Sequence, residues 1–342
     1  MKKILLHSTN SKNNNLFDPN IRDNYNQPYI FLKNKLFDLG YELITSDDNS
    51  LDDVYFVFFN DFTSVYYYYG FKGKIKKILS IFNKNYRFRD LFNEIQGTKI
   101  KSILFLWEAS AVIPNNWDKK FHDKFDTILT WDDNYIDNKK YFKLFWPQTN
   151  LFPIIEKISF KNKKLLVNIS MNKSSKFPLE LYSERLNSIT FFDKNYPNDF
   201  DLYGFGWNEP YTTYIFKRSI KFQSYRGTVK NKWNVLPLYK FAICYENIKN
   251  TKGLVTEKIF DCFRCNCVPI YWGASNIFDF IPPSTFIDRR NFKTNEELAS
   301  YIININEFEY MEFIKNINVF INSEMFELFL PENYYNTVSK HL

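Results

Sequence analysis

The sequence contains little cysteine and no long apolar run. Four of its 342 residues are cysteines, and so few in a long chain without a recognisable signal sequence predict a reducing location, the cytoplasm. No apolar run reaches the roughly 18 residues that a membrane-spanning helix needs. Only Ile4, Leu5 and Leu6 follow the first lysines, which is too short for a signal peptide and predicts a β-strand.

A strong excess of charge is also absent. The net charge of +7 is too small to indicate nucleic-acid binding, but it fits an anionic ligand or an anionic membrane surface. Hydrophobic residues make up 45% of the chain and aromatic residues 20%, which excludes a disordered protein. A chain of 342 residues is expected to form two domains.

Short apolar runs alternate with a helical pattern in the first half of the chain. The runs predict strands at residues 2–8, 41–46, 54–60, 102–108 and 126–132. Residues 29–40 have apolar side chains at helical spacing and end at Gly40, a typical C-terminal cap. Strands that alternate with helices predict an α/β fold with a mostly parallel sheet.

The second half repeats this pattern. It predicts a helix over residues 256–265 and strands at residues 164–170, 200–206, 239–247 and 267–273. Two prolines and a charged run between Pro147 and Lys164 indicate a linker. We therefore expect an N-terminal domain at residues 1–155 and a C-terminal domain at residues 156–342 that includes a helical tail.

Open parallel sheets bind ligands beyond the carboxyl ends of their strands. The residues that follow three predicted strands are therefore candidates for a functional site. They are Glu108 after ILFLW, Asn247 after FAICYE, and Gly273 after VPIYW.

Three cysteines lie within six residues in the stretch LVTEKIFDCFRCNCVPIYWG. With the distant Cys244, the residues Cys262, Cys265 and Cys267 contain enough sulfur for a zinc site. The spacing is poor for zinc, because a helix and a strand divide the three residues and neither a second CxxC pair nor a histidine is near. Small buried side chains that pack in the core are the favoured interpretation.

The same stretch contains the sequence TEK at residues 256–258. Thr256 or a neighbouring residue could cap a helix whose first turn contains Glu257 and Lys258. The N-terminus of a helix favours anions, and a lysine there adds a charge for phosphate. From the local sequence alone, a solvated Glu–Lys pair at the start of an amphipathic helix is the favoured interpretation.

A longer segment favours a phosphate-binding site over a solvated Glu–Lys pair. YKFAICYENIKNTKGLVTEKIFDCFRCNCVPIYWGASNIFDFIPPSTFIDRRNF, residues 239–292, strongly resembles the donor-binding signature of the α1,3/4-fucosyltransferases, glycosyltransferase family 10. LFLWEASAVIP resembles the acceptor-side segment of the family, with Ala109 and Ser110 where Ser and Pro are common. Three further segments are similar in the same order along the chain, at residues 125–142, 168–175 and 200–207.

The resemblance implies a GT-B architecture, in which two Rossmann-like domains have a cleft between them. The first domain would bind the acceptor and the second the GDP-sugar donor. It also implies an inverting transfer of fucose from GDP-fucose, with no metal required, to a hydroxyl of a surface glycan or lipopolysaccharide. That hydroxyl is expected to be O3 of N-acetylglucosamine or a related residue.

The resemblance also implies roles for individual residues. Glu108 matches the proposed catalytic base of the family, and Lys258 matches its phosphate-binding lysine. A base is needed because the acceptor hydroxyl is a weak nucleophile, and cations must meet the charge that develops on GDP. Glu257 would accept hydrogen bonds from the ribose hydroxyls. Tyr245 and Asn247 would line the donor pocket.

The family also places an arginine on the loop before the segment YKFAICYEN. Two residues of this chain fit that position, Arg226 in SYRGTVKNK and Arg218 in FKRSI. Arg226 is favoured for the contact with the diphosphate because it lies closer to the strand.

The segment from Lys72 to Asp90 combines seven basic residues with apolar ones at helical spacing, Ile75, Ile78, Leu79, Phe82 and Tyr86. Two interpretations remain open. A basic amphipathic helix can lie on an anionic membrane, here the inner face of the cytoplasmic membrane. Alternatively, the helix packs its apolar face into the core of its domain.

Two other functions are compatible with the sequence. A transferase of the same family could use another GDP-sugar, because the motifs indicate GDP better than the sugar ring. A non-catalytic nucleotide- or carbohydrate-binding protein could have kept the fold, although the presence of Glu108, Glu257 and Lys258 together argues against it.

Overall fold

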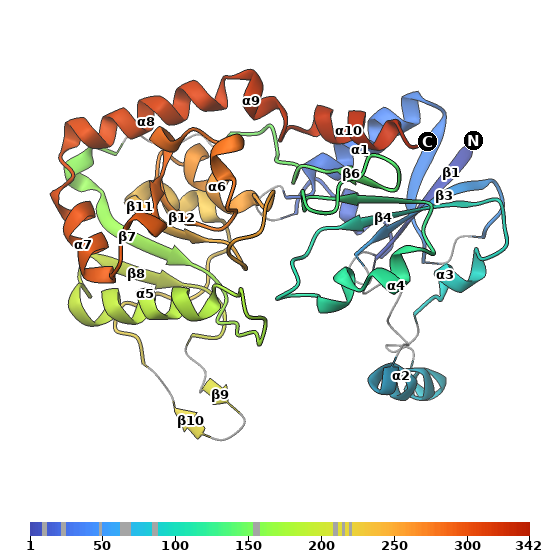
Figure 1. Cartoon of the computed structure of the whole chain (residues 1–342), viewed down its shortest axis with the longest axis horizontal. Helices are drawn as coiled ribbons and strands as arrows, with labels where there is room; N and C mark the ends of the chain where they lie inside the picture. The colour runs from blue at the N-terminus through green and yellow to red at the C-terminus, as the bar shows by residue number, and fades with distance from the viewer. Residues whose placement is uncertain are drawn as a thin grey trace. The chain divides into compact units, whose positions relative to one another are not determined.

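The chain forms two compact units in a computed structural model (Figure 1). One unit comprises residues 1–149 and 329–342, and the other comprises residues 150–328. The structure describes residues 1–8, 12–21, 25–47, 50–61, 70–83, 88–152, 158–207, 211–213, 216–218 and 221–342.

A six-stranded parallel sheet forms the centre of the first unit, with the strand order β2-β1-β3-β4-β5-β6. The strands are β1 (Lys2–His7), β2 (Tyr41–Thr45), β3 (Val54–Asn60), β4 (Lys101–Leu106), β5 (Thr127–Thr130) and β6 (Tyr141–Lys143). The helices are α1 (Gln27–Asp38), α2 (Gly70–Phe82), α3 (Leu91–Glu94), α4 (Lys119–His122) and α10 (Pro331–Ser339), with short 3-10 turns η1 (Asn15–Phe17) and η5 (Pro114–Trp117).

Both faces of this sheet are buried. Ile4 and Leu6 of β1 pack with α1 and α10 on one face, while Leu5 packs with α3 on the other. Burial on both sides explains why these strands are continuous apolar runs and do not alternate with polar residues. Gly40, with a φ of 84°, lies just beyond the end of α1, where a left-handed residue is needed to end the helix.

The second unit has a five-stranded parallel sheet with the order β13-β12-β11-β7-β8. Its strands are β7 (Lys164–Ile169), β8 (Phe200–Tyr203), β11 (Tyr239–Tyr245), β12 (Val268–Trp272) and β13 (Ile287–Asp288). A separate antiparallel pair consists of β9 (Tyr211–Thr213) and β10 (Phe216–Arg218).

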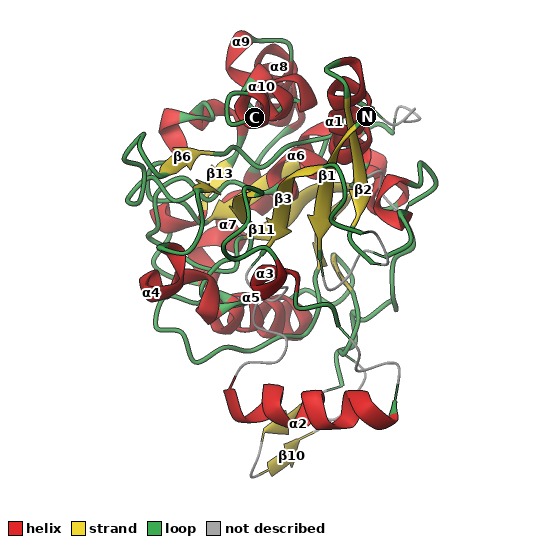
Figure 2. Ribbon diagram, turned by 90° about the vertical axis from the view of Figure 1, so that its right-hand side faces the viewer, coloured by secondary structure: helices red, strands yellow, loops and turns green. Residues whose placement is uncertain are grey.

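Helices cover the faces of the sheets, as Figure 2 shows. Those of the second unit are α5 (Tyr182–Asn195), α6 (Glu257–Arg264), α7 (Asn295–Asn304), α8 (Glu307–Ile321) and α9 (Glu324–Glu327). Its 3-10 turns are η6 (Phe160–Asn162), η7 (Lys232–Asn234), η8 (Leu236–Leu238), η9 (Ile277–Asp279), η10 (Pro283–Thr285) and η11 (Arg289–Asn291).

The α/β fold and every strand expected from the apolar runs are confirmed. The expected division at residue 155 needs correction in one respect. The end of the chain, residues 329–342, belongs to the first unit and not to the second. Tyr334 and Val338 of α10 are buried against Leu32 and Leu36 of α1, so an apolar stripe on the last helix returns it to the N-terminal core.

The basic segment from Lys72 to Asp90 is helical only as far as Phe82. Residues 84–87, which include Tyr86, lie outside the described part of the chain, and residues 88–90 are not helical. The large apolar side chains of α2 from Ile75 onward are exposed. The interpretation as a core-packed helix is therefore wrong. No described helix is long and apolar enough to cross a membrane.

Candidate functional site

The carboxyl edge of the second sheet contains a buried carboxylate that the sequence analysis did not single out. Glu246 follows β11 directly and is completely buried. Its Oε1 accepts hydrogen bonds from the backbone and the hydroxyl of Thr256, each at 2.9 Å. Its Oε2 accepts one from Nζ of Lys258, also at 2.9 Å. Glu246 thus ties the end of β11 to the start of α6.

Gly273 makes room for this carboxylate. A Cβ atom at position 273 would lie 2.5 Å from Cγ of Glu246 and 2.5 Å from the hydroxyl of Tyr271. Such a distance is too short for two carbon atoms, so only glycine fits after β12. The sequence analysis chose Gly273 for its place at the strand end, and its structural role is to admit Glu246.

Lys258 and Glu257 lie at the first turn of α6. Nζ of Lys258 donates to Glu246 and, at 2.8 Å, to the hydroxyl of Thr256. Nζ of Lys258 and Nζ of Lys232 each lie 3.9 Å from a carboxylate oxygen of Glu257.

These charges shift the pKa values of the pair. Burial alone would raise the pKa of Glu257, but the charges of Lys258 and Lys232 outweigh it and lower the pKa to about 2. Burial opposes the charged form of Lys258, yet Glu246 and Glu257 raise its pKa above the ordinary lysine value. Both side chains are therefore charged at neutral pH, and both remain partly accessible to solvent.

Lys232 is a basic residue of this edge that the sequence analysis did not select. It lies on η7, within the SYRGTVKNK segment, and its Nζ pairs with Asp261 of α6 at 2.8 Å. A lysine in a loop gives no signal by itself, because its distance to α6 depends on the fold. Arg290, after β13, lies at the same edge and pairs with Asp288 at 2.7 Å.

Tyr245 is the last residue of β11 and is only 1% exposed. Its hydroxyl lies 3.1 Å from that of Ser188 in α5. This is the environment of a packing side chain, so the expectation that Tyr245 lines a donor pocket is not supported. Asn247 is half-buried, and its carbonyl accepts from the backbone of Leu181 at 3.0 Å. Arg185 of α5 donates to the carbonyl of Tyr245 at 2.6 Å, which fixes the strand end.

Arg226 does not join this cluster. Its Nε forms an ion pair with Asp201 at 2.7 Å, and Asp201 also accepts from Lys164 and Tyr239 at 2.6 Å each. Asp201 lies in the middle of the sheet, level with Ala242 of β11. The backbone of Arg226 pairs with β8 near the carboxyl end of that strand.

The contact of Arg226 with the diphosphate stays a prediction. Its Nε is engaged by Asp201, and its backbone lies beside the carboxyl half of β8, toward the end of the sheet where nucleotides bind. Arg218, the other candidate, is the last residue of β10, and its side chain lies outside the described part of the structure.

In the first unit, Glu108 follows β4 and is partly buried. Asp61 follows the neighbouring strand β3, and its Oδ1 accepts from the backbone N–H groups of Trp107 and Glu108 at 2.9 and 3.1 Å. Asn116 donates to the same oxygen at 2.7 Å. The carbonyl of Glu108 accepts from the indole of Trp117 at 3.1 Å. The backbone of Glu108 is thus held on both sides.

Asp61 is another functional candidate that the sequence analysis missed. Its φ of 64° is left-handed, a conformation that aspartate and asparagine tolerate better than most residues. Burial raises the pKa of Asp61 to about 6, and the charge of Glu108 adds to this effect. The only signal in the sequence is a single carboxylate directly after an apolar strand.

The four cysteines are buried and free. The thiol of Cys262 contacts those of Cys244 and Cys267, and these contacts together with burial raise its pKa well above the ordinary value. Burial also raises the pKa of Cys265. Metal ligation needs thiolates, so this environment favours neutral packing side chains. Among the described residues, no group of three or more histidine, cysteine or acidic side chains is arranged to bind a metal.

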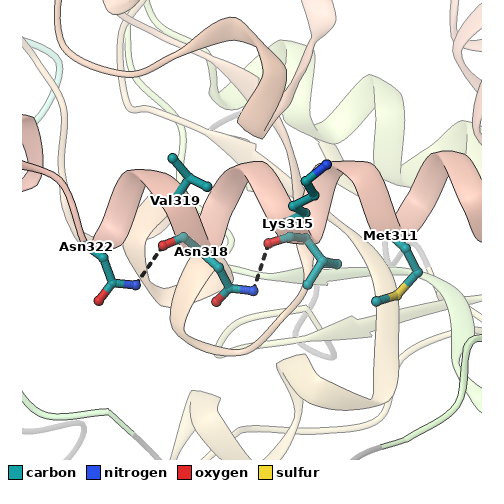
Figure 3. Close-up of a pocket in the computed structure, with 6 residues that line it drawn as sticks. Met311, Lys315, Asn318, Val319 and Asn322 are labelled. Carbon is teal, nitrogen blue, oxygen red and sulfur yellow. Dashed lines mark hydrogen bonds between the residues drawn. The ribbon is translucent and has the colours of Figure 1, made fainter.

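A hollow of about 560 Å³ lies along α8 (Figure 3). Its lining comes from α8 and the residue that caps it, namely Met311, Ile314, Lys315, Asn318, Val319 and Asn322. The amides of Asn318 and Asn322 donate to carbonyls of the same helix, at 2.9 and 2.7 Å. Side chains from a single helix do not converge on a ligand, so the hollow is not a candidate active site.

The fold is that of GT-B glycosyltransferases, with a parallel α/β sheet in each unit. A crystal structure of an α1,3-fucosyltransferase with GDP-fucose matches with a TM-score of 0.50 and 15% identity, over 92% of this chain and 81% of that one. Residues 201–326 match the family model described as glycosyltransferase family 10 (fucosyltransferase) C-term. The segment that matches this family model includes Glu246, Glu257 and Lys258.

Two relatives match shorter segments. An α-(1,3)-fucosyltransferase of Helicobacter pylori is 40% identical over 74 residues, which is 22% of this chain and 15% of the relative. An α-(1,4)-fucosyltransferase of Arabidopsis thaliana is 45% identical over 64 residues, which is 19% of this chain and 16% of the relative. The matched segments thus span only a small part of these relatives.

Proposed function

We propose that this chain transfers fucose from GDP-fucose to a hydroxyl group of a glycan, with inversion at the anomeric carbon. The observation that carries the proposal is the position of Lys258. It lies at the carboxyl edge of the second sheet, inside the domain that matches family 10. The carboxyl edge of a parallel sheet is where nucleotides bind in folds of this kind.

The second unit would bind the donor. Nζ of Lys258 has three N–H donors, and Glu246 and Thr256 accept two of them. The third is available for a phosphate oxygen. Because Glu246 is buried and ionically paired, it holds the ammonium group in place before the donor arrives. The carboxylate of Glu257, with its pKa of about 2, remains ionised and would accept from the ribose hydroxyls.

The first unit would bind the acceptor and supply the base. Glu108 would take the proton of the acceptor hydroxyl while its oxygen attacks the anomeric carbon of fucose. The bond from that carbon to the diphosphate oxygen breaks, and GDP leaves with the electron pair. Lys258 meets the negative charge on the diphosphate. A single displacement of this kind inverts the anomeric configuration, and the proton on Glu108 returns to solvent.

The reaction as proposed needs no metal, because the cations of the chain meet the charge of the leaving group. Lys258, Lys232 and Arg290 all lie at the carboxyl edge of the second sheet. We expect a chelator to leave the transfer rate unchanged and purified protein to contain no stoichiometric zinc. Elemental analysis and a rate assay with chelator test this. One zinc per chain, lost together with activity, would assign Cys244, Cys262, Cys265 and Cys267 to a metal site.

The acceptor that we propose is a surface glycan or a lipopolysaccharide precursor, modified at O3 of N-acetylglucosamine or a related residue. The reaction would take place in the cytoplasm, where both the nucleotide sugar and such precursors occur. The names of the two relatives include α1,3 and α1,4 linkages, so the acceptor position needs a direct test.

The test is a screen of GDP-fucose and other GDP-sugars against a panel of glycan acceptors, with GDP release and product mass as readouts. Transfer from GDP-fucose alone supports the proposal. Faster transfer from another GDP-sugar would keep the family chemistry and change the sugar. Binding of GDP in a titration without turnover on any acceptor would show a non-catalytic binding protein.

A further inference from the structure

Helix α2 exposes an unusual combination of side chains. Its 13 residues contain four lysines and no acidic residue. Five large apolar side chains are between 39% and 82% exposed to solvent, namely Ile75, Ile78, Leu79, Ile81 and Phe82. Figure 2 shows α2 as a separate helix outside the layers that cover the sheet of its unit.

The exposed apolar residues have a regular order. Ile75, Ile78, Leu79 and Phe82 are spaced at i, i+3, i+4 and i+7, so they share one face of the helix. At about 100° per residue, Lys72 and Lys74 lie on the two borders of that stripe. A folded protein normally buries such a stripe, and the described part of this unit does not cover it.

We propose that α2 lies in the interface of an anionic lipid bilayer and holds the enzyme at the membrane surface. A helix with lysines on its polar face and Ile, Leu and Phe on its other face has the composition of interfacial helices. The negative surface potential of anionic lipids attracts the lysines, and the stripe enters the boundary between headgroups and acyl chains. This proposal concerns binding only and stands apart from the proposed transfer reaction.

The positive charge of α2 is the reason for proposing an anionic lipid surface as its partner. The comparison within the chain is α8, which also exposes large apolar side chains, Phe308, Met311 and Val319. Helix α8 contains three glutamates and one lysine, so an anionic bilayer would repel it. Exposed apolar area alone therefore does not predict membrane binding, whereas the same area combined with four lysines does.

The experiment is co-sedimentation of the full chain with vesicles of phosphatidylcholine and phosphatidylglycerol, and with vesicles of phosphatidylcholine alone. We expect binding to the anionic vesicles that weakens with added salt, because exposed charges are screened. Replacing Lys72, Lys74 and Lys77 with Gln should weaken binding about 100-fold, at about fivefold for each lysine. The double variant Ile78→Ser/Phe82→Ser should abolish measurable binding.

The matched control is Met311→Ser/Val319→Ser on α8, which removes two exposed apolar side chains and should leave vesicle binding unchanged. All variants should keep the GDP affinity of the wild type, which shows that they fold. The proposal is overturned if the chain does not bind anionic vesicles or if the α2 variants bind as well as the wild type. It is also overturned if sedimentation shows a dimer that the α2 variants dissociate, because a second copy would then cover the stripe.

Discussion

The carboxylates at the carboxyl ends of the two sheets have different surroundings, which shift their pKa values in opposite directions. In the second unit, Glu246 and Glu257 each lie beside a lysine, and the pKa of Glu257 falls to about 2. In the first unit, Asp61 accepts hydrogen bonds from N–H groups, and burial and the charge of Glu108 raise its pKa to about 6. Glu257 of the second unit therefore stays ionised at neutral pH, whereas Asp61 of the first unit keeps its proton up to a higher pH than an ordinary aspartate.

This difference matches the two tasks of a glycosyl transfer. Binding a nucleotide diphosphate requires cations that stay charged and in place, which paired and buried carboxylates provide. The cations at the second edge therefore support the proposal that this unit binds the donor. The proposed base, Glu108, lies beside Asp61, and its role stays a prediction.

The largest expected effect comes from Glu108. Glu108→Gln keeps the shape of the side chain and removes its basicity, so kcat should fall by at least about 10²-fold. Steady-state rates at saturating donor and acceptor measure this. Glu108→Asp, which keeps a carboxylate, is the matched control and should retain more activity than Glu108→Gln. Near-normal turnover of Glu108→Gln would mean that another residue takes the proton.

Removal of Lys258 should weaken the binding of GDP and reduce transfer. A charge-assisted contact of this kind contributes about 1.5–3 kcal/mol, so Lys258→Met should raise the Kd for GDP roughly 10- to 150-fold. It should also destabilise the fold by about 3 kcal/mol, because Glu246 loses its ion pair. Titration calorimetry and thermal unfolding measure the two effects.

The double variant Lys258→Met/Glu246→Gln separates the effect on GDP binding from the effect on stability. A glutamine in place of Glu246 leaves no buried charge and can still accept from Thr256, so stability should recover while GDP binding remains weak. If GDP binding recovered together with stability, Lys258 would be a structural residue and not a ligand for phosphate.

The pH dependence of stability should reveal Asp61. Its pKa rises from 3.8 to about 6 on folding, so the folded state binds the proton more tightly than the unfolded state. Stability should therefore fall by about 1–2 kcal/mol, after allowance for solvent screening, as pH rises from about 4 to about 6. Asp61→Asn retains an oxygen for the same N–H donors and should remove this fall. Denaturant unfolding across that pH range would show an equal slope in both proteins if Asp61 does not titrate there.

The smallest expected effect concerns Arg226. Its guanidinium already pairs with Asp201 and donates to the carbonyl of Gln223, so Arg226→Met should raise the Kd for GDP less than Lys258→Met does. The equivalent change at Lys258 is the comparison. A loss of tenfold or more in Arg226→Met would mean that the arginine reaches the diphosphate after all, as the family resemblance implied.

Much of the fold was predictable because parallel strands buried on both faces are continuous apolar runs. The strand ends, and hence Glu108, Asn247 and Gly273, followed from those runs. The short strand β6 and the short helices α3 and α4 give no comparable periodic signal. The membership of α10 in the first unit depends on contacts with α1 across nearly 300 residues, which no local pattern contains.

Site residues within the family-like motif could be predicted from the sequence. Residues that only the folded sheet brings to its carboxyl edge could not. Glu257 and Lys258 came from the resemblance and lie where a phosphate site is expected. Glu246 was included in the predicted strand at residues 239–247 and was not selected as a site residue. A single carboxylate at the end of an apolar strand nevertheless indicates a buried ion pair. Lys232 was not selected because chain distance alone does not show that a residue of η7 lies next to the first turn of α6.

The central claim is that the second unit binds GDP and the first unit supplies the catalytic base. Titration with GDP tests this claim most directly, because it does not require the acceptor to be known. GDP is titrated into the wild type, Glu108→Gln and Lys258→Met/Glu246→Gln. We predict that Glu108→Gln binds GDP within about twofold of the wild type, while the double variant binds at least about tenfold more weakly. Weakened binding in Glu108→Gln, or unchanged binding in the double variant, would contradict the division of labour between the two edges.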